Sequence, residues 1–381
     1  MRIYLDHNAT TPLRPEVVSE MLRVLEGEYG NPSSTHEEGA AARATVERAR
    51  EQVARCLNVD ASSVSFTGGA TEANSTVLRG LVASRTEPGH FVTSETEHPS
   101  VIAPLADLEA LGHRVTRLKV DADGLLDPAQ VAAALRDDTL LVSLIWANNE
   151  TGVVQPMAEI AELVRARGIK LHVDATQAIG KTPVDLGQIP VDFLSASAHK
   201  LNGPKGVGCL VAADPMLLPP LLNGGGQEQG RRAGTENVAS IAGFGVACEL
   251  AQRELELRME HYGALRDRLW EGISAKVPHV TRNGLPEHTL CNTLNVEFEG
   301  SAGEVLLQAL DLDGVAVSAG AACHSGSVTP SHVLSAMGRS PEQARGCLRL
   351  SVGHGVDNDQ IDRVIEVLTT LVPRVRQAGP Q

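Results

Sequence analysis

Short apolar strand patterns alternate with helical patterns from about residue 40 to residue 250, and this alternation most constrains the fold. The candidate strands, in chain order, are 64–67, 91–94, 115–118, 140–145, 168–173 and 191–196. Strands that alternate with helices favour a mostly parallel sheet with helices on both faces. The apolar segment 206–211 follows the last of these strands too closely for a helical crossover, so we expect it to pair antiparallel.

The length of the chain, 381 residues, favours two domains. We expect a large domain over residues 14–255 and a smaller α+β domain built from residues 1–13 and 256–381. A long helical run is predicted from about Val238 to Ala275. The clearest strands of the smaller domain are 292–298 and 348–352.

Composition disfavours several classes of function. The chain has 33 lysines and arginines against 47 aspartates and glutamates, a formal net charge of −14. Nucleic-acid binding needs a basic surface, so we expect no such partner. No apolar run approaches the length of about 18 residues that suggests a membrane span, and the start has no secretory pattern, so we expect no membrane association. Six scattered cysteines form no C-x-x-C pair, which argues against zinc and disulfides and fits a reducing cytoplasm.

Polar side chains follow four of the strand patterns: His98, Asn149, Asp174 and Lys200. Ligands of open α/β sheets bind at the carboxyl ends of strands, so we expect these four side chains to converge. A pyridoxal-phosphate enzyme needs the last two, because a lysine amine forms the Schiff base with the aldehyde and a carboxylate keeps the pyridine nitrogen protonated. The alternative is a surface lysine and a strand-end aspartate, with the histidine an ordinary loop residue.

A glycine-rich turn at 68–72 (GGATE) lies where a strand pattern becomes a helical one. Small residues let the backbone approach a phosphate, and the free amides and dipole of the helix stabilise its charge. The hydroxyl of Thr71 adds a further donor. The alternative is an ordinary helix start capped by that threonine. The turn matches neither G-x-G-x-x-G nor G-x-x-x-x-G-K-[ST], which weakens a dinucleotide or ATP interpretation.

Together these motifs resemble those of a cysteine desulfurase of the aminotransferase class V family, within fold type I of the pyridoxal-phosphate enzymes. The resemblance covers nearly the whole chain. Its motifs are 4–12 (YLDHNATTP), 30–34 (GNPSS), 69–72 (GATE), 96–98 (TEH), 148–152 (NNETG), 174–177 (DATQ), 197–200 (SAHK), 234–235 (GT) and Arg349. It implies a mostly parallel seven-stranded sheet with helices on both faces, plus a smaller C-terminal α+β domain.

The resemblance also implies the cofactor, pyridoxal 5'-phosphate, and the residues that hold it. Lys200 would carry it covalently and later move protons, Asp174 would pair with the pyridine nitrogen, and His98 would stack over the ring. Gln177 and Asn149 would lie near the phenolic oxygen. The phosphate would be held by Ala70, Thr71, Ser197 and His199.

Two further implications concern substrate and subunits. Asn31 and Arg349 match positions that bind the carboxylate of the L-cysteine substrate, for which the planar fork of arginine is suited. The threonine matching Thr235 reaches the phosphate of the neighbouring subunit, which implies a homodimer.

Cys323 separates a desulfurase from an aminotransferase. It lies in a run of small residues, 318–327 (SAGAACHSGS), which favours a loop over a core position. Its thiolate would attack the sulfur of bound cysteine, keep it as a persulfide and leave alanine, given a lowered thiol pKa or a nearby base. The alternative is a small buried residue. The other five cysteines fit core or bystander positions better.

The chain departs from the family pattern in places that leave alternatives open. His324 stands where Thr or Ser usually follows the loop cysteine, and Cys-His-Ser here resembles selenocysteine lyases as well as some bacterial desulfurases. Gly353-His354 stands where Gly-Arg is usual. A selenocysteine lyase therefore remains an alternative, as do a class V aminotransferase and a non-catalytic scaffold. The chain ends soon after its last helical pattern, without the longer tail that some desulfurases use to engage an iron–sulfur scaffold, so the acceptor, such a scaffold or another protein, is a less secure expectation than the chemistry.

Overall fold

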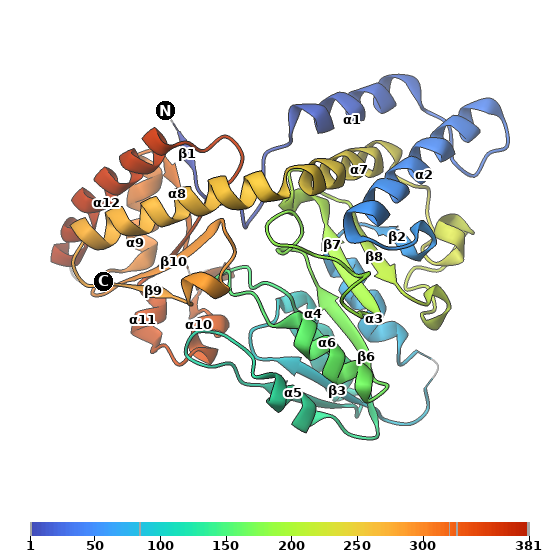
Figure 1. Cartoon of the computed structure of the whole chain (residues 1–381), viewed down its shortest axis with the longest axis horizontal. Helices are drawn as coiled ribbons and strands as arrows, with labels where there is room; N and C mark the ends of the chain where they lie inside the picture. The colour runs from blue at the N-terminus through green and yellow to red at the C-terminus, as the bar shows by residue number, and fades with distance from the viewer. Residues whose placement is uncertain (1, 84, 320, 325–326, 379–381) are drawn as a thin grey trace.

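The computed structural model describes residues 2–83, 85–319, 321–324 and 327–378; of residues 321–324, 327–329 and 378 it describes the backbone alone. Figure 1 shows the large sheet and its helices at the right of the molecule, and the smaller sheet and its helices at the left. Helices α7 (Val238–Arg253) and α8 (Leu255–Lys276) run end to end across the molecule. Among the described residues, no helix is long and apolar enough to cross a membrane.

The large sheet has seven strands in the order β2-β8-β7-β6-β5-β3-β4. Their bounds are β2 Val64–Thr67, β3 His90–Ser94, β4 Arg114–Leu118, β5 Thr139–Ile145, β6 Lys170–Asp174, β7 Phe193–Ser197 and β8 Gly208–Ala212. Strands β4, β3, β5, β6 and β7 pair parallel, whereas β8 pairs antiparallel with both β7 and β2. The predicted mostly parallel seven-stranded sheet and the antiparallel segment after Lys200 are thus confirmed.

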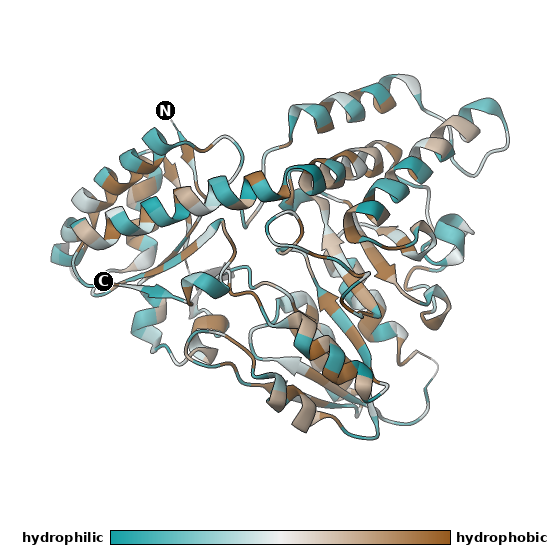
Figure 2. Ribbon diagram, viewed as in Figure 1, coloured by the Kyte–Doolittle hydropathy of each residue, from teal (hydrophilic) through white to brown (hydrophobic). Residues whose placement is uncertain are grey.

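Helices cover both faces of this sheet because its strands are apolar on both faces. Successive side chains of a strand point to opposite faces, and neighbours such as Phe91 and Val92 belong to different apolar clusters. Helices α3 (Ala70–Gly80) and α4 (Pro99–Ala110) pack on the Phe91 face. The other face is covered by α1 (Pro15–Gly27), α2 (Glu37–Leu57), α6 (Met157–Ala166) and α7. Figure 2 shows the strands as mainly hydrophobic and the helices as two-sided.

The remaining elements of the large sheet's side are short. They are α5 (Pro128–Ala134) and the 3-10 turns η1 (Ala61–Ser63), η2 (Ala198–Lys200), η3 (Pro215–Leu217) and η4 (Gln227–Gly230). The turn η4 is fixed by Glu228, whose buried carboxylate accepts hydrogen bonds from Arg50 of α2 at 2.7 and 3.0 Å. This ion pair connects the segment before Thr235 to the main body of the protein.

The smaller sheet has four strands in the order β12-β15-β10-β9, all antiparallel. Their bounds are β9 Val280–Asn283, β10 Thr293–Phe298, β12 Ser318–Ala319 and β15 Cys347–Ser351. Around it lie η5 (Pro286–His288), α9 (Gly303–Leu312), α10 (His332–Ala336), α11 (Pro341–Arg345) and α12 (Asn358–Ala378). Helix α12 packs against α8 and α9, and its buried side chains recur three or four residues apart, among them Ile361, Val364, Leu368 and Val372.

Two further strand pairs complete the fold. The first strand of the chain, β1 (Ile3–Tyr4), pairs parallel with β11 (Val315–Ala316), so the N-terminus joins the smaller sheet's side. A hairpin is formed by β13 (Ala321–His324) and β14 (Ser327–Pro330).

The single helical run predicted from about Val238 to Ala275 is wrong in one respect, because it is two helices separated at Glu254. The backbone there leaves the helical region, with φ −103° and ψ 6°. The Glu254 carboxylate accepts hydrogen bonds from Arg14 at 2.8 Å and from Arg258 at 3.1 Å. The break therefore fastens the start of α8 to the segment before α1, a tertiary contact that helical propensity does not report.

Candidate active site

The four polar side chains that follow parallel strands lie together, as predicted. Strands β3, β5, β6 and β7 are adjacent in the sheet and parallel, so their carboxyl ends share one edge. A cavity of about 800 Å³ opens at this edge and is lined by His98, Asn149, Asp174 and Lys200. The same cavity is lined by Ala70, Thr71, Gln177, Ser197 and His199.

Asp174 ends β6 and is buried, with only 3% of its surface exposed. One carboxylate oxygen accepts a hydrogen bond from Asn74 Nδ2 at 2.8 Å, and the other accepts one from the Thr176 amide at 3.0 Å. Asn74 Nδ2 also donates to Ser100 Oγ at 2.8 Å, and Ser100 Oγ lies 2.7 Å from His98 Nδ1. A fully buried amide thus connects the carboxylate on one wall of the cavity to the histidine on another.

Lys200 lies in the turn that follows β7, and its amine donates to the backbone carbonyls of Asn8 and of Ala9, the latter at 2.8 Å. Burial, together with the nearby positive charge of Arg349, lowers the pKa of this amine to about 8. Asp6 and Asp174 oppose that shift. Near neutral pH about a tenth of the amine is therefore neutral and nucleophilic, far more than in an exposed lysine.

This lowered pKa predicts how the cofactor-free protein reacts with pyridoxal 5'-phosphate. Only the neutral amine attacks the aldehyde, so the rate of covalent attachment should rise with pH through about 8 and then level off. An exposed lysine would show its rise near pH 10.4 instead. The rate is measured from the absorbance change on mixing at pH 6 to 11, and a midpoint near the ordinary lysine value would contradict the assignment.

The opposite end of the cavity suits a phosphate. Helix α3 begins there, and no described side chain caps its first turn. Gly69, before that turn, has φ +150° and ψ 176°, a conformation that glycine favours. A Cβ on Gly69 would lie at an ordinary contact distance of 3.7 Å from Ser197 Oγ, so the backbone conformation rather than a lack of space favours glycine here. Free amides, a helix dipole and hydroxyls are the groups that bind a phosphate in other proteins.

The charges around this end also match an anion. Lys200 and Lys205 both line the cavity. His199 Nδ1 lies 3.2 Å from Thr10 Oγ1, and burial together with the neighbouring lysines lowers the pKa of this histidine to about 4. His199 is therefore neutral near pH 7 and offers a hydrogen bond rather than a charge. This set of donors, in a cavity that Asp174 and Lys200 also line, fits pyridoxal 5'-phosphate.

His98 stands at the mouth of this cavity as the residue before α4. Its Nδ1 accepts a hydrogen bond from the Ser100 amide at 3.1 Å, which fixes the ring. The side chain is exposed because it faces the open cavity, yet the surrounding protein still lowers its pKa below the usual value by desolvation. A neutral ring held in one orientation can stack on an aromatic ligand and can accept a proton.

Sequence reasoning missed Lys181, which lies behind Gln177. Its amine donates to Gln177 Oε1 at 2.5 Å, and Gln177 Nε2 donates to the carbonyl of Asn8 at 2.9 Å. Burial, followed by the charge of Lys200, lowers the Lys181 pKa to about 7. The spacing of four residues between Gln177 and Lys181 was the available signal, since side chains at i and i+4 meet along a helical turn. Asn74 was missed as well.

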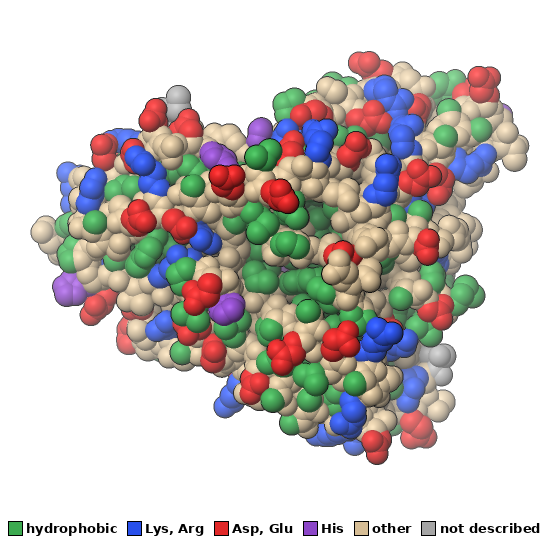
Figure 3. Space-filling view, viewed as in Figure 1, with side chains coloured by type: hydrophobic (Ala, Val, Ile, Leu, Met, Phe, Trp, Pro, Cys, Tyr) green, Lys and Arg blue, Asp and Glu red, His purple; other side chains and the backbone are tan. Residues whose placement is uncertain are grey.

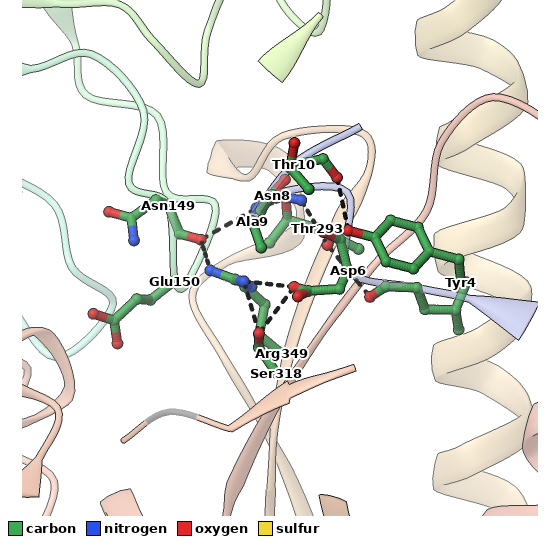
Figure 4. A network of polar contacts seen from close by, with 12 residues as sticks. Tyr4, Asp6, Asn8, Ala9, Thr10, Asn149, Glu150, Thr293, Ser318 and Arg349 are labelled. Carbon is green, nitrogen blue, oxygen red and sulfur yellow. Dashed lines mark hydrogen bonds and ion pairs between the residues drawn. The ribbon is translucent and has the colours of Figure 1, made fainter. Parts of the chain in front are cut away.

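Three residues predicted for substrate or cofactor do not line this cavity. Asn31 is exposed, and its side chain accepts a hydrogen bond from the Ser33 amide. Thr235 is also exposed. Arg349 is buried beside the cavity and bonded to Asp6, Ser318 and the backbone of Asn149, as Figure 4 shows.

The backbone at Cys323 differs from the loop predicted for it. Residues Ala321–His324 form strand β13 and pair with β14, Cys323 opposite Val328. Strand-favouring residues at 328 and 329 explain the pairing, because Val and Thr fit a pleated surface. The Cys323 side chain and Gly320, Ser325 and Gly326 lie outside the described part of the structure.

A second cavity, of about 660 Å³, lies below α8 between that helix and the 286–291 segment. Figure 3 shows hydrophobic side chains gathered in the middle of this face. The lining of this second cavity contains Lys181 and Arg266 but no carboxylate comparable to Asp174. Glu287 is its one acidic residue among those described. The first cavity is therefore the candidate active site.

Comparisons with known proteins agree on one family. The family model described as aminotransferase class-V matches residues 3–364. The chain is 43% identical over 379 residues to cysteine desulfurase IscS of Methanosarcina thermophila, which covers 99% of this chain and 94% of that protein. A solved NifS-like protein superposes with a TM-score of 0.93 at 34% identity and covers 98% of this chain and 100% of that one. The structure described as SspA in complex with cysteine gives 0.82 at 35% identity, covering 92% and 99%.

Proposed function

We infer that this chain, which belongs to the aminotransferase class-V family, is a cysteine desulfurase that converts L-cysteine to L-alanine and retains the sulfur on Cys323. The observation that carries this function is the meeting of Asp174 and Lys200 in one cavity that also ends in a phosphate-type cluster of donors. Its relatives over the full length of the chain are named cysteine desulfurases, which favours this function over a selenocysteine lyase or an aminotransferase.

We propose that the cavity holds pyridoxal 5'-phosphate. Lys200 would attach it, Asp174 would pair with its ring nitrogen and His98 would cover the ring. The remaining contacts would come from Ala70, Thr71, Asn149, Gln177, Ser197 and His199. When bound, this cofactor supplies an electron sink that stabilises negative charge on the substrate carbon next to it.

The residues of the chain then divide the work of the reaction. Arg349 and Asn31 would bind the substrate carboxylate, and Lys200 would move a proton to and from the substrate. The Cys323 thiolate would form an S–S bond to the substrate sulfur while the substrate Cβ–S bond breaks. The substrate Cβ then takes up a proton and L-alanine leaves the site. Cys323 is left carrying one added sulfur atom.

Three of the described cysteines are poor candidates for this step. Cys209, Cys248 and Cys347 are buried, and burial raises the pKa of the Cys347 thiol to about 12. A buried thiol with a raised pKa is unreactive because the thiolate is the nucleophile. Five free thiols among the described residues also fit a reducing compartment, and we propose the cytoplasm.

We further propose a homodimer. Several large hydrophobic side chains are exposed on α1, just after it and in η3, among them Leu25, Tyr29 and Met216, which are 66%, 83% and 88% exposed. Leu221, also exposed, lines the cavity itself. A second copy covering this surface would bury these side chains and would bring its own Thr235 to the phosphate end. Within each copy we propose the domain division 14–255 against 1–13 with 256–381.

The proposed reaction also requires an acceptor for the sulfur. A persulfide on Cys323 has to be passed on, either to an iron–sulfur scaffold or to another acceptor protein. His324 beside the cysteine, as in selenocysteine lyases, makes it worth testing L-selenocysteine alongside L-cysteine.

The proposed function is tested by incubating the holoenzyme with L-cysteine and analysing its peptides by mass spectrometry. We expect one added sulfur atom on the peptide that carries Cys323, and we expect Cys323→Ala to release no alanine from L-cysteine. Cys56→Ala serves as the matched control and should behave as the wild type. Sulfur on another cysteine, or full activity of Cys323→Ala, would refute the assignment.

A further inference from the structure

The Asp6 carboxylate is paired with Arg349, the arginine proposed to bind the substrate carboxylate. Asp6 Oδ1 lies 2.6 Å from Arg349 Nη2. Ser318 Oγ accepts a hydrogen bond from the same Nη2 at 3.0 Å and donates to Asp6 Oδ1 at 2.9 Å. Figure 4 shows the three side chains in contact, next to the backbone of Asn149.

The donors of Arg349 leave no complete edge for a second carboxylate. A guanidinium has one hydrogen on Nε and two on each Nη, and a carboxylate is bound through two parallel hydrogen bonds on one edge. Both such edges include Nη2, whose hydrogens point to Asp6 and Ser318. Nη1 donates to the Asn149 carbonyl at 2.8 Å, and the buried Nε has no hydrogen-bond partner among the described atoms.

The positions of these groups are fixed by strands. Arg349 is the middle residue of β15, and Ser318 pairs with it across β12. Asp6 is bridged to Ser351 at the end of the same strand, and Tyr4 Oη donates to the Asp6 carbonyl at 3.0 Å. Asp6 and Arg349 thus meet through rigid backbone rather than through mobile side chains on a loop.

The burial of Arg349 explains why its pairing with Asp6 is useful. Arg349 is 8% exposed, and a buried guanidinium without a counter-charge is strongly destabilising. A substrate carboxylate would provide that counter-charge, but only while substrate is bound. Two carboxylates on the same Nη2 would repel each other, so a bidentate substrate has to displace Asp6.

On this basis we propose that Asp6 is an internal placeholder for the substrate carboxylate: it neutralises Arg349 in the empty enzyme, gives way to substrate, and so sets the affinity for the substrate carboxylate. The proposal rests on the proposed function, in which Arg349 binds that carboxylate. It makes Asp6 a specificity-determining residue that takes no part in the chemical step.

The test compares two ligands of the holoenzyme that differ only in the carboxylate, L-alanine and ethylamine. Their dissociation constants are measured from the absorbance of the bound cofactor. In Asp6→Asn the placeholder loses its charge, so we expect the constant for L-alanine to fall about fivefold and that for ethylamine to stay the same. The KM for L-cysteine should fall by a similar factor without a matching rise in kcat. An unchanged or larger constant for L-alanine would overturn the proposal.

Ser318→Ala gives a second, milder test should Asp6→Asn fold poorly. It frees one hydrogen of Nη2 while leaving the Asp6 charge in place, so the L-alanine constant should fall by less than in Asp6→Asn. A rise would again overturn the proposal. The matched control is Asp362→Asn, which removes an exposed aspartate paired with Arg268 on the same side of the molecule and should change neither constant.

Arg349→Gln separates this proposal from the proposed function. If it leaves the ratio of the two constants unchanged, Arg349 does not bind the carboxylate and the substrate assignment fails. If it abolishes the preference for L-alanine while Asp6→Asn has no effect, only the placeholder role fails.

Discussion

Replacing Lys200 with alanine is expected to lower the turnover of L-cysteine by about a thousandfold or more, because the variant loses both the amine that attaches the cofactor and the group that moves the proton. The other buried lysine nearby is held away from this position. The Lys200 amine is held by two backbone carbonyls at residues 8 and 9, and Lys181, the other buried lysine nearby, is bonded to Gln177 instead.

The measurement combines alanine release with reduction of the protein by borohydride. In the wild type we expect the reduced cofactor on the peptide that contains Lys200, and in Lys200→Ala on no peptide. Lys170→Ala is the matched control, since Lys170 pairs with Asp192 at the opposite edge of the sheet. Labelling of the peptide that contains Lys181 in the wild type would show that the two buried lysines had been assigned the wrong way round.

The second large effect is expected for Asp174→Asn, which should lower kcat by about a hundredfold or more while the protein still binds its cofactor. An amide has nearly the shape of the carboxylate but carries no charge, so it does not keep the ring nitrogen protonated. One of the hydrogen bonds from Asn74 and from the Thr176 amide would also be lost, because one side of the new amide is a donor facing a donor.

This variant is distinguished from a merely misfolded protein by its absorbance spectrum and its thermal stability. We expect cofactor stoichiometry near that of the wild type together with the loss in kcat. Asp192→Asn, which breaks the pair with Lys170, provides the matched control and should keep its activity. A loss in Asp174→Asn that pyridoxal 5'-phosphate restores at high concentration would indicate weakened binding instead of an altered ring nitrogen.

The sequence predicted the large sheet and the cavity well because both depend on local patterns. Apolar strands bounded by polar residues locate the strands, and parallel order places His98, Asn149, Asp174 and Lys200 at one edge. Resemblance to a known family added the phosphate contacts, and the structure places Ala70 and Ser197 on the same cavity.

The buried polar pairs and the helix break that the sequence did not predict depend on contacts between distant segments, which no local pattern reports. Asp6 and Arg349 are 343 residues apart in sequence, and Asn74 reaches Asp174 over 100 residues. The break at Glu254 likewise follows from an ion pair with Arg14, 240 residues away. Each of these is a charged or amide side chain buried by tertiary packing, where pairing decides its position.

The pairing of β1 with β11 has a consequence for the order in which the protein is made. The two strands are more than 300 residues apart, and the residues just after β1 supply the carbonyls that hold Lys200. Asn8 in turn is bonded to Thr293. During synthesis the first dozen residues leave the ribosome long before their partners exist, so they have to remain unpaired until residues 293 and 315 have emerged. The cavity is therefore completed only when almost the entire chain has been translated.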